Sequence, residues 1–247
     1  MVAAATLLLT LAVSASGAKG SLSENLLIAS EALGYELQYR VYRPDSEAKD
    51  LPVLYITDGQ WYISQGKMPR LLDKLIGKGR IEPIIAVFVD NRNPHDLSEN
   101  RRNRQFFCNP DYVRFFTEEL VPAIDRDYPS HPHREDRVVL GLSFGALSSA
   151  CFGLLAHQSF QGIAMQSPAM HPVPEIYEAY SKSPALDLRI FLSTGTIGDN
   201  LDQAVRLREV LKKKGYELRY VAVPQGHDWL NWGPLLDDVL EFYFRRK

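Results

Sequence analysis

The residues most suited to covalent chemistry form the segment GLSFG at positions 141–145, in which a serine lies between two glycines. A β-branched run at 137–140 precedes it and small and apolar residues at 146–156 follow it, which predicts a strand, a sharp turn and a helix. Glycine permits both a strained turn and a close approach of strand and helix. Ser143 would then project its hydroxyl from the sheet as a nucleophile, beside backbone N–H groups that can stabilise an oxyanion. A helix-capping serine on an ordinary turn is the alternative.

A serine hydroxyl becomes a good nucleophile only when a base takes its proton, and the chain has six histidines. His227 directly follows a predicted strand at 217–223, so it would lie at the same carboxyl edge of a parallel sheet as the serine. The remaining histidines fall in loops or near a helix end, where a surface position is the simpler interpretation: His95, His131, His133, His157 and His171. We predict His227 as general base and acid; the alternative is a loop histidine beside the turn residue Gly226.

The imidazole in turn needs a carboxylate that fixes its tautomer and stabilises its protonated form. Asp199 lies just past a predicted strand at 189–193, which gives the order serine, aspartate, histidine along the chain. Asp202 is the rival, although it is placed to cap the following helix. Asp228 is adjacent to His227 in sequence, so we expect its side chain to point away from the ring. The sequence therefore favours Asp199 as the acid and leaves Asp202 open.

Hydrophobic patterning predicts the elements that must position these side chains. Continuous apolar runs rich in β-branched residues are typical of central parallel strands. The predicted strands are 25–30, 36–42, 52–57, 83–90, 137–140, 163–165, 189–193 and 217–223. Apolar residues at helical spacing predict helices at 110–128, 146–156, 202–214 and 233–244. We expect the first two strands to lie at the edge of the sheet.

The alternation of strands and helices implies an α/β class with a mostly parallel central sheet and helices on both faces. A length of 247 residues with 45% hydrophobic residues fits one domain, spanning 19–247, and no repeat or linker marks a second. The segment 171–185, which contains three prolines, is the one candidate for a small cap. We therefore expect little or no cap domain.

Charge and cysteine content limit the partners and cofactors. The 28 lysine and arginine residues nearly balance 30 aspartate and glutamate residues, so no strong field attracts nucleic acid or an anionic membrane. A small molecule is the expected partner.

The two cysteines, Cys108 and Cys151, have neither the spacing of a metal site nor the density of a disulfide scaffold. We interpret both as free thiols, with Cys151 in a helix, and expect no metal and no organic cofactor.

The apolar run at 2–13, followed by small residues at 14–18, resembles a secretory signal peptide with a cleavable end. It is too short to cross a bilayer, which takes about 20 residues, so we expect no stable membrane insertion. However, no lysine or arginine precedes the run. A periplasmic or secreted protein is the preferred interpretation, and a cytoplasmic protein with an apolar N-terminal segment is the alternative.

Together these motifs resemble the enterochelin esterase-like esterases, which are related to S-formylglutathione hydrolases and mycolyltransferases. The similar segments are LPVLYITDG at 51–59, ELVPAID at 119–125, the serine segment, and GHDW at 226–229 with Trp232. The resemblance implies an α/β-hydrolase fold and a serine esterase that forms an acyl-enzyme. It also implies an oxyanion hole made by the backbone N–H groups of Gln60 and Phe144, with Trp61 bordering the pocket.

Some positions depart from the family pattern. Ala146 stands where a second glycine is usual after the serine segment, and Gln105 stands where the family tends to have a glutamate, which puts an arginine–carboxylate pair there in doubt. The longer histidine-containing serine segment of S-formylglutathione hydrolases is absent from the sequence. This absence argues against that particular activity.

The expected substrate is a small-molecule ester, and the resemblance favours an aryl or siderophore-type ester. Trp61, Trp229 and Arg102 are the predicted substrate contacts, because aromatic walls suit a planar group and a cation suits an anionic one. Core packing of Trp229 and Trp232, and solvation of the arginines around Arg102, are the competing interpretations. An acyltransferase with the same triad and a non-catalytic binding protein with the hydrolase fold remain alternatives.

Overall fold

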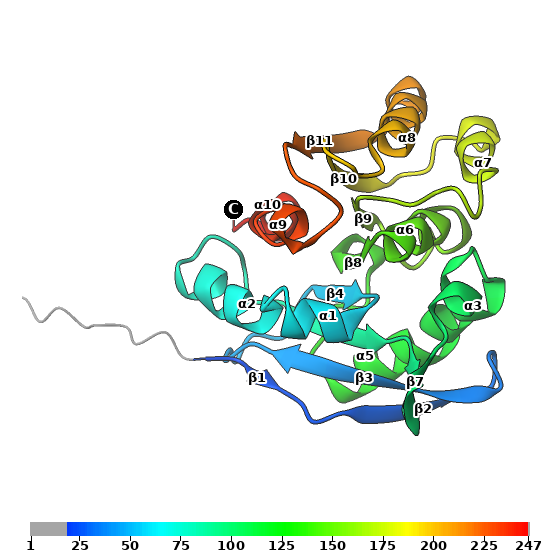
Figure 1. The fold of residues 1–247 in the computed structure, drawn as a ribbon. Helices are drawn as coiled ribbons and strands as arrows, with labels where there is room; N and C mark the ends of the chain where they lie inside the picture. The colour runs from blue at the N-terminus through cyan, green and yellow to red at the C-terminus, as the bar shows by residue number, and fades with distance from the viewer. Residues whose placement is uncertain (1–18, 247) are drawn as a thin grey trace, which may run out of the picture.

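The computed structural model describes residues 19–246, and nine strands within that range form one central sheet (Figure 1). The predicted signal peptide at 1–18 lies outside the described residues. The strand order is β1-β3-β5-β4-β8-β9-β10-β11, with β2 paired to β3. The strands are β1 (Ser21–Leu22), β2 (Leu26–Ser30), β3 (Tyr35–Arg43), β4 (Val53–Ile56), β5 (Ile85–Asp90), β8 (Arg137–Leu142), β9 (Gly162–Gln166), β10 (Arg189–Gly195) and β11 (Glu217–Val223).

Six adjacent strands of the sheet run parallel to one another: β5, β4, β8, β9, β10 and β11. The strands β1, β2 and β3 form antiparallel pairs. All eight predicted strands are present, with ends shifted by no more than two residues. The predicted α/β class with a mostly parallel sheet is therefore confirmed. A short ribbon of β6 (Arg92–Asn93) and β7 (Asp96–Asn100), stabilised by antiparallel pairing, was not predicted.

Side chains of successive strand residues enter two separate cores, one on each face of the sheet. In β4, Val53 and Tyr55 pack on one face and Leu54 and Ile56 on the other. Buried side chains of α1 (Gly59–Ser64), α2 (Met68–Gly77) and α10 (Leu236–Phe244) complete the second core. Those of α4 (Pro110–Arg114), α5 (Val121–Asp127), α6 (Phe144–Leu155), α7 (Ile176–Lys182) and α8 (Leu201–Lys214) complete the first. The sheet is thus covered on both faces, as Figure 1 shows.

The helix predicted at 110–128 contains a wider π-helical turn, η1, over Phe115–Leu120, between α4 and α5. The N–H of Val121 donates to the carbonyl of Phe116, five residues back. Pro122 follows at the start of α5 and has no N–H to donate. A π turn relieves such a position without ending the helix.

The structure corrects two predictions about helices and shows what the segment 171–185 forms. The last helix was predicted from 233, but a separate short helix α9 (Trp229–Trp232) precedes α10, which begins at Leu236. The cap of α8 is Asn200, so Asp202 lies in the first turn and is not the cap. The segment 171–185, the candidate for a small cap, contains α7, whose Tyr180 donates a hydrogen bond to the carbonyl of Ala150 in α6 at 2.8 Å, so this segment packs beside α6.

The two cysteines form a disulfide between Cys108 and Cys151, with their Cα atoms 5.2 Å apart. The prediction of two free thiols is therefore wrong, although Cys151 does lie in a helix, α6. The two residues are 43 positions apart in sequence, and spacing alone does not report that the loop after α3 (Arg102–Phe106) folds onto α6. The disulfide therefore joins the loop after α3 to α6, the helix that directly follows Ser143.

Replacing Cys108 and Cys151 by serine should lower the free energy of unfolding by about 2 to 4 kcal/mol, because the link closes a loop of moderate length in the unfolded chain. Denaturant unfolding in the presence and absence of a reducing agent measures this effect. The reducing agent should destabilise the wild type and leave the double serine variant unchanged. Equal stability of the oxidised and fully reduced wild type would contradict the prediction.

Candidate active site

The candidate catalytic side chains and their polar neighbours lie together where five parallel strands end. The loops that follow β4, β8, β9, β10 and β11 carry Asp58, Ser143, Ser167, Asp199 and His227 in that order. Parallel strands place their carboxyl ends at one edge of a sheet, so residues distant in sequence become neighbours there.

Ser143 occupies a strained turn between β8 and α6, with φ 56° and ψ −117°. Its backbone N–H donates to the carbonyl of Gln166 at the end of β9, at 2.9 Å. Few non-glycine residues adopt such a conformation, and those that do cluster at functional sites. The turn directs the serine side chain out of the sheet edge.

The two glycines that flank Ser143 are required by close packing. A Cβ atom on Gly141 would lie 2.2 Å from the carbonyl group of Gly145, and one on Gly145 would lie 2.7 Å from the hydroxyl oxygen of Thr57. Real Cβ atoms do not approach other atoms this closely. The backbone of β8 therefore packs directly on the first turn of α6, and that turn packs directly on Thr57 after β4.

His227 contacts both of its predicted partners. Its Nε2 atom lies 2.9 Å from Oγ of Ser143, and its Nδ1 atom lies 2.6 Å from Oδ1 of Asp199. Because an ionised carboxylate can only accept, Nδ1 carries the proton and Nε2 is free to accept the proton of the serine hydroxyl. The structure thus brings the three predicted residues together in the order that base-assisted nucleophilic attack requires.

Asp199 is held by a set of donors that surround its buried carboxylate, whose side chain is 0% exposed. Oδ2 accepts from the hydroxyl of Ser167 at 2.6 Å, from the N–H of Gly195 at 2.5 Å and from the amide of Asn231 at 2.9 Å. Oδ1 accepts from the N–H of Asn200 at 2.7 Å. Sequence reasoning missed Ser167 and Asn231; the one available signal was that Ser167 directly follows a predicted strand.

These donors decide the protonation state of Asp199. Burial raises its pKa, but hydrogen bonds from His227, Ser167 and the two backbone N–H groups outweigh burial and lower the pKa to about 2. Because this value lies below the usual value of about 3.9 in an unfolded chain, the ionised group stabilises the fold above about pH 4. That contribution is lost as the pH falls through 2.

The two other candidate acids point elsewhere. Asp228 accepts from the N–H of Leu230 at 2.8 Å and so caps α9, in agreement with the expectation that it turns from the ring. Asp202 lies in the first turn of α8. The carboxylate in contact with His227 is that of Asp199.

Gln60 and Phe144, the predicted oxyanion donors, lie in the first turns of α1 and α6. First-turn N–H groups have no acceptor within their own helix, so they are free to bind an anionic oxygen. Gly59 precedes Gln60, and a Cβ there would lie 2.5 Å from the backbone of Phe88 in β5. Close packing therefore fixes the start of α1 against the sheet.

A hollow of about 360 Å³ opens beside Ser143 and His227. It is lined by Trp61, Gln65, Arg102, Leu142, Ser143, His227, Asp228, Trp229 and Trp232. All three predicted substrate contacts, Trp61, Arg102 and Trp229, thus border the space in front of the serine. A ligand bound there would lie between indole rings and the triad.

The two C-terminal tryptophans differ in their surroundings. Trp232 is buried, donates from Nε1 to the hydroxyl of Ser167 at 2.8 Å, and places its ring 5.0 Å from that of His227. Trp229 is half-buried and packs edge to face on Tyr62. Trp232 therefore packs between Ser167 and His227, which matches the packing interpretation, and Trp229 lines the hollow.

Of the three neighbouring arginines, Arg102 alone lines this hollow. Its guanidinium binds Asp58, with Nε 2.9 Å from Oδ1 and Nη2 2.9 Å from Oδ2. Arg101 and Arg104 both stack on the ring of Tyr35, at 4.3 and 5.1 Å. Gln105, where a glutamate is usual in the family, hydrogen-bonds to the hydroxyl of Tyr35 at 3.3 Å, so the arginine–carboxylate pair involves a different acid.

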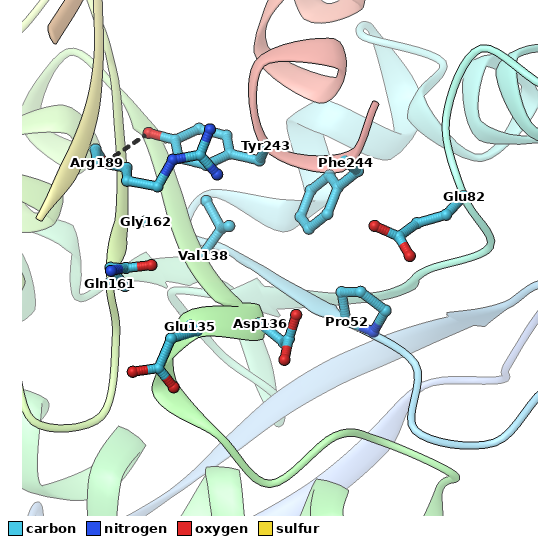
Figure 2. A pocket seen from close by; sticks show the side chains of 10 residues that line it. All are labelled: Pro52, Glu82, Glu135, Asp136, Val138, Gln161, Gly162, Arg189, Tyr243 and Phe244. Carbon is cyan, nitrogen blue, oxygen red and sulfur yellow. Dashed lines mark hydrogen bonds between the residues drawn. The ribbon is translucent and has the colours of Figure 1, made fainter. Parts of the chain in front are cut away.

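A second hollow, shown in Figure 2, lies at the opposite edge of the sheet. Pro52, Val138, Gly162 and Arg189 line it at the amino ends of β4, β8, β9 and β10, and Tyr243 of α10 hydrogen-bonds to the carbonyl of Arg189. Its volume of about 20 Å³ has room for about one water molecule. It is therefore too small to hold an ester substrate.

No group of three or more histidine, cysteine, aspartate or glutamate side chains among residues 19–246 is placed to hold a metal ion. Over the same range, no helix combines the length and apolar character needed to cross a membrane.

A mostly parallel sheet, a serine on a strained strand-to-helix turn and a histidine after the last strand define a protein of the α/β-hydrolase class. The family model described as "Putative esterase" matches residues 30–243. The chain therefore belongs to this esterase family, and the family resemblance seen in the sequence is confirmed.

Similar proteins include esterases for two kinds of ester. The chain is 26% identical over 240 residues to an uncharacterised protein, YjcH, of Bacillus subtilis, covering 90% of this chain and 97% of YjcH. It is 24% identical to the iron(III) salmochelin esterase of Escherichia coli, covering 83% of this chain and 54% of that one. A solved ferulic acid esterase superposes with a TM-score of 0.79 at 19% identity, covering 92% and 98% of the two chains. The chain thus spans about half the length of the salmochelin esterase.

Proposed function

We propose that the chain is a serine carboxylic-ester hydrolase in which Ser143 is the nucleophile, His227 the general base and acid, and Asp199 the carboxylate behind the histidine. The observation that carries the proposal is the pair of contacts made by one imidazole, 2.9 Å to the serine hydroxyl and 2.6 Å to the buried aspartate. Membership of the esterase family supports the same reaction.

In the first step Ser143 attacks the ester carbonyl carbon while His227 takes the hydroxyl proton, and Asp199 stabilises the resulting imidazolium. The backbone N–H groups of Gln60 and Phe144 donate hydrogen bonds to the negative oxygen of the tetrahedral intermediate. His227 then protonates the leaving alkoxide, which departs as the alcohol and leaves an acyl-enzyme. In the second step His227 activates a water molecule, and the carboxylic acid is released.

An aryl or siderophore-type ester is the proposed substrate class. The partly buried indoles of Trp61 and Trp229 beside the serine suit a planar aromatic acyl group. The similarity to a salmochelin esterase and to a ferulic acid esterase supports this choice.

The proposal is tested by labelling the wild-type protein with a fluorophosphonate probe and then measuring turnover of three esters: methyl ferulate, a catecholate ester of serine, and p-nitrophenyl butyrate. We expect labelling, and a higher kcat/KM for the two aromatic acyl groups than for the alkyl one. A protein that is neither labelled nor active would be a non-catalytic binding protein. Product analysis with an added alcohol distinguishes the remaining alternative, because an acyltransferase would form the new ester in preference to the free acid.

Asp199→Asn should lower kcat about 10⁴-fold, because the amide would present a donor to Nδ1 and favour the wrong tautomer of His227. The matched control is Asp202→Asn, which changes the rival acid in the first turn of α8 and should leave kcat within about twofold of wild type. Steady-state kinetics on p-nitrophenyl butyrate measure both variants. The opposite ranking would transfer the role to Asp202.

We also propose that the protein is exported to the periplasm or beyond. The Cys108–Cys151 disulfide supports this location, because disulfides persist in oxidising compartments, and the apolar run at 2–13 has the composition of a signal sequence. Cell fractionation and N-terminal sequencing of the mature protein test the proposal. A full-length chain recovered from the cytoplasm would favour the cytoplasmic alternative.

A further inference from the structure

The carboxylate of Asp58 lies fully buried beside the candidate active site, with a side chain 0% exposed. Asp58 ends the loop after β4 in a left-handed conformation, φ 55°, and directly precedes α1, whose first turn contains Gln60. Both of its oxygens accept hydrogen bonds from Arg102, at 2.9 and 3.0 Å from Nε and at 2.9 Å from Nη2. The pair therefore has the two-pronged geometry that fixes orientation as well as distance.

The same guanidinium also holds the nucleophile turn. Nη2 of Arg102 donates to the carbonyl of Leu142 at 3.1 Å, one residue before Ser143. The guanidinium carbon lies 5.2 Å from the ring centre of Trp61 and 5.3 Å from that of Phe144. One side chain thus contacts both backbone segments that carry the oxyanion N–H groups.

A second set of hydrogen bonds links Gln60 to Arg102 through two asparagines. The Gln60 amide donates to Oδ1 of Asn91 at 2.8 Å, and the Asn91 amide donates to Oδ1 of Asn100 at 2.8 Å. Oδ1 of Asn100 also accepts from the backbone N–H of Arg102 at 2.9 Å. The ribbon of β6 and β7 therefore fixes Gln60 and Arg102 relative to each other.

Burial raises the pKa of Asp58 to about 6, although the charge and hydrogen bonds of Arg102 lower it. An unpaired carboxylate in this position would be expensive to keep ionised. It would also place a negative charge near the site where the oxyanion forms. Arg102 thus neutralises the Asp58 carboxylate, and its hydrogen bonds also link Asp58 to the Leu142 carbonyl.

We propose that Asp58 and Arg102 are positioning residues that hold the backbone N–H groups of Gln60 and Phe144 at the separation needed to bind the oxyanion. This inference rests on the proposed function of Ser143. It differs from a role for Arg102 in binding substrate, because the contacts that carry it run to Asp58 and to the Leu142 carbonyl, within the protein.

The test compares Arg102→Met, Arg102→Lys and Asp58→Asn with the wild type on p-nitrophenyl butyrate. For Arg102→Met and Asp58→Asn we expect kcat to fall about 10- to 100-fold with KM within about twofold, because misplaced oxyanion donors weaken binding of the transition state alone. Arg102→Lys should recover part of kcat, since it keeps the charge but not the two-pronged geometry. The double variant Asp58→Asn/Arg102→Met should be no slower than the worse single variant, because the pair acts as a unit.

A second readout separates positioning from general damage to the fold. A trifluoromethyl ketone forms a tetrahedral oxyanion on the serine, so its inhibition constant should rise by about the same factor as kcat falls. The control is Arg137→Met, which breaks a partly buried pair with Asp125 at the other end of β8, where Nη2 lies 2.5 Å from Oδ2. This control should lower the free energy of unfolding but leave kcat and inhibitor binding unchanged.

Several outcomes would overturn the inference. An increase in KM at constant kcat would make Arg102 a substrate contact, and wild-type kcat in Arg102→Lys would show that the two-pronged pair is not needed. A fall in kcat with unchanged inhibitor binding would place the damage outside the oxyanion site. A wild type that is neither labelled by the fluorophosphonate nor active would instead remove the proposed function itself, and the inference with it.

Discussion

Ser143→Ala should lower kcat for p-nitrophenyl butyrate by about 10³- to 10⁶-fold and abolish fluorophosphonate labelling, because the oxygen proposed to form the acyl-enzyme would be removed. The fold should be unaffected, since the Ser143 contacts to Gln166 and Ala169 involve its backbone alone. Steady-state kinetics, intact-protein mass spectrometry after labelling and thermal unfolding measure the three quantities.

Ser181→Ala provides the matched control, because this exposed serine in α7 loses the same single oxygen and does not line the hollow beside Ser143. It should retain wild-type kcat and full labelling. Retention of more than a tenth of wild-type kcat by Ser143→Ala would mean that another group performs the attack.

His227→Ala should reduce kcat by a similar factor, because Ser143 would lose the base 2.9 Å from its hydroxyl. Labelling by the fluorophosphonate should slow in proportion, since the probe also requires an activated serine. Removing both residues should cost little more than removing one, as expected for groups that act in a single step. The measurements are kcat and the second-order labelling rate for the two single variants and the double variant.

His157→Ala is the control for the histidine, because His157 lies at the end of α6 and contacts the carbonyl of Leu154 through Nδ1 at 3.2 Å. It should behave as wild type. A double variant far slower than either single variant would indicate that the two side chains contribute independently, in conflict with the proposed relay of one proton.

Much of the fold followed from the sequence because a buried parallel strand has a strong local signal. The runs at 52–57, 83–90 and 137–140 are continuous and β-branched, and they form β4, β5 and β8 with small shifts at their ends. The positions of Ser143, Asp199 and His227 in loops after such strands then predicted their meeting at one edge. Chain order and strand polarity were sufficient for that step.

Disulfides and ion pairs between side chains of different loops could not be predicted in this way. The Cys108–Cys151 link depends on where the loop after α3 packs, and no local pattern reports that position. The binding of Arg102 by Asp58 depends on a left-handed turn at an aspartate, a conformation that glycine or asparagine would have signalled better. The sequence placed Arg102 beside the pocket but gave no information about its partner.

The support around Asp199 shows a further limit. Besides His227, five donors surround its carboxylate, and two of them, Ser167 and Asn231, are small polar residues with no distinctive spacing. Such residues are common in loops, so only their convergence in space identifies them. The contribution of the Ser167 hydrogen bond to the low pKa of Asp199 could not be anticipated from residue types.

The last strand in the order, β11, leaves one of its sides unpaired by any other strand among residues 19–246. Glu217 there pairs with Arg189, Arg219 pairs with Asp238, and Arg208 stacks on the ring of Tyr220 at 4.7 Å. A foreign strand that docked along this edge would meet these charged side chains, which natural sheets use to disfavour edge-to-edge pairing. The charged residues at the β11 edge thus disfavour aggregation at the side where the sheet could otherwise add another strand.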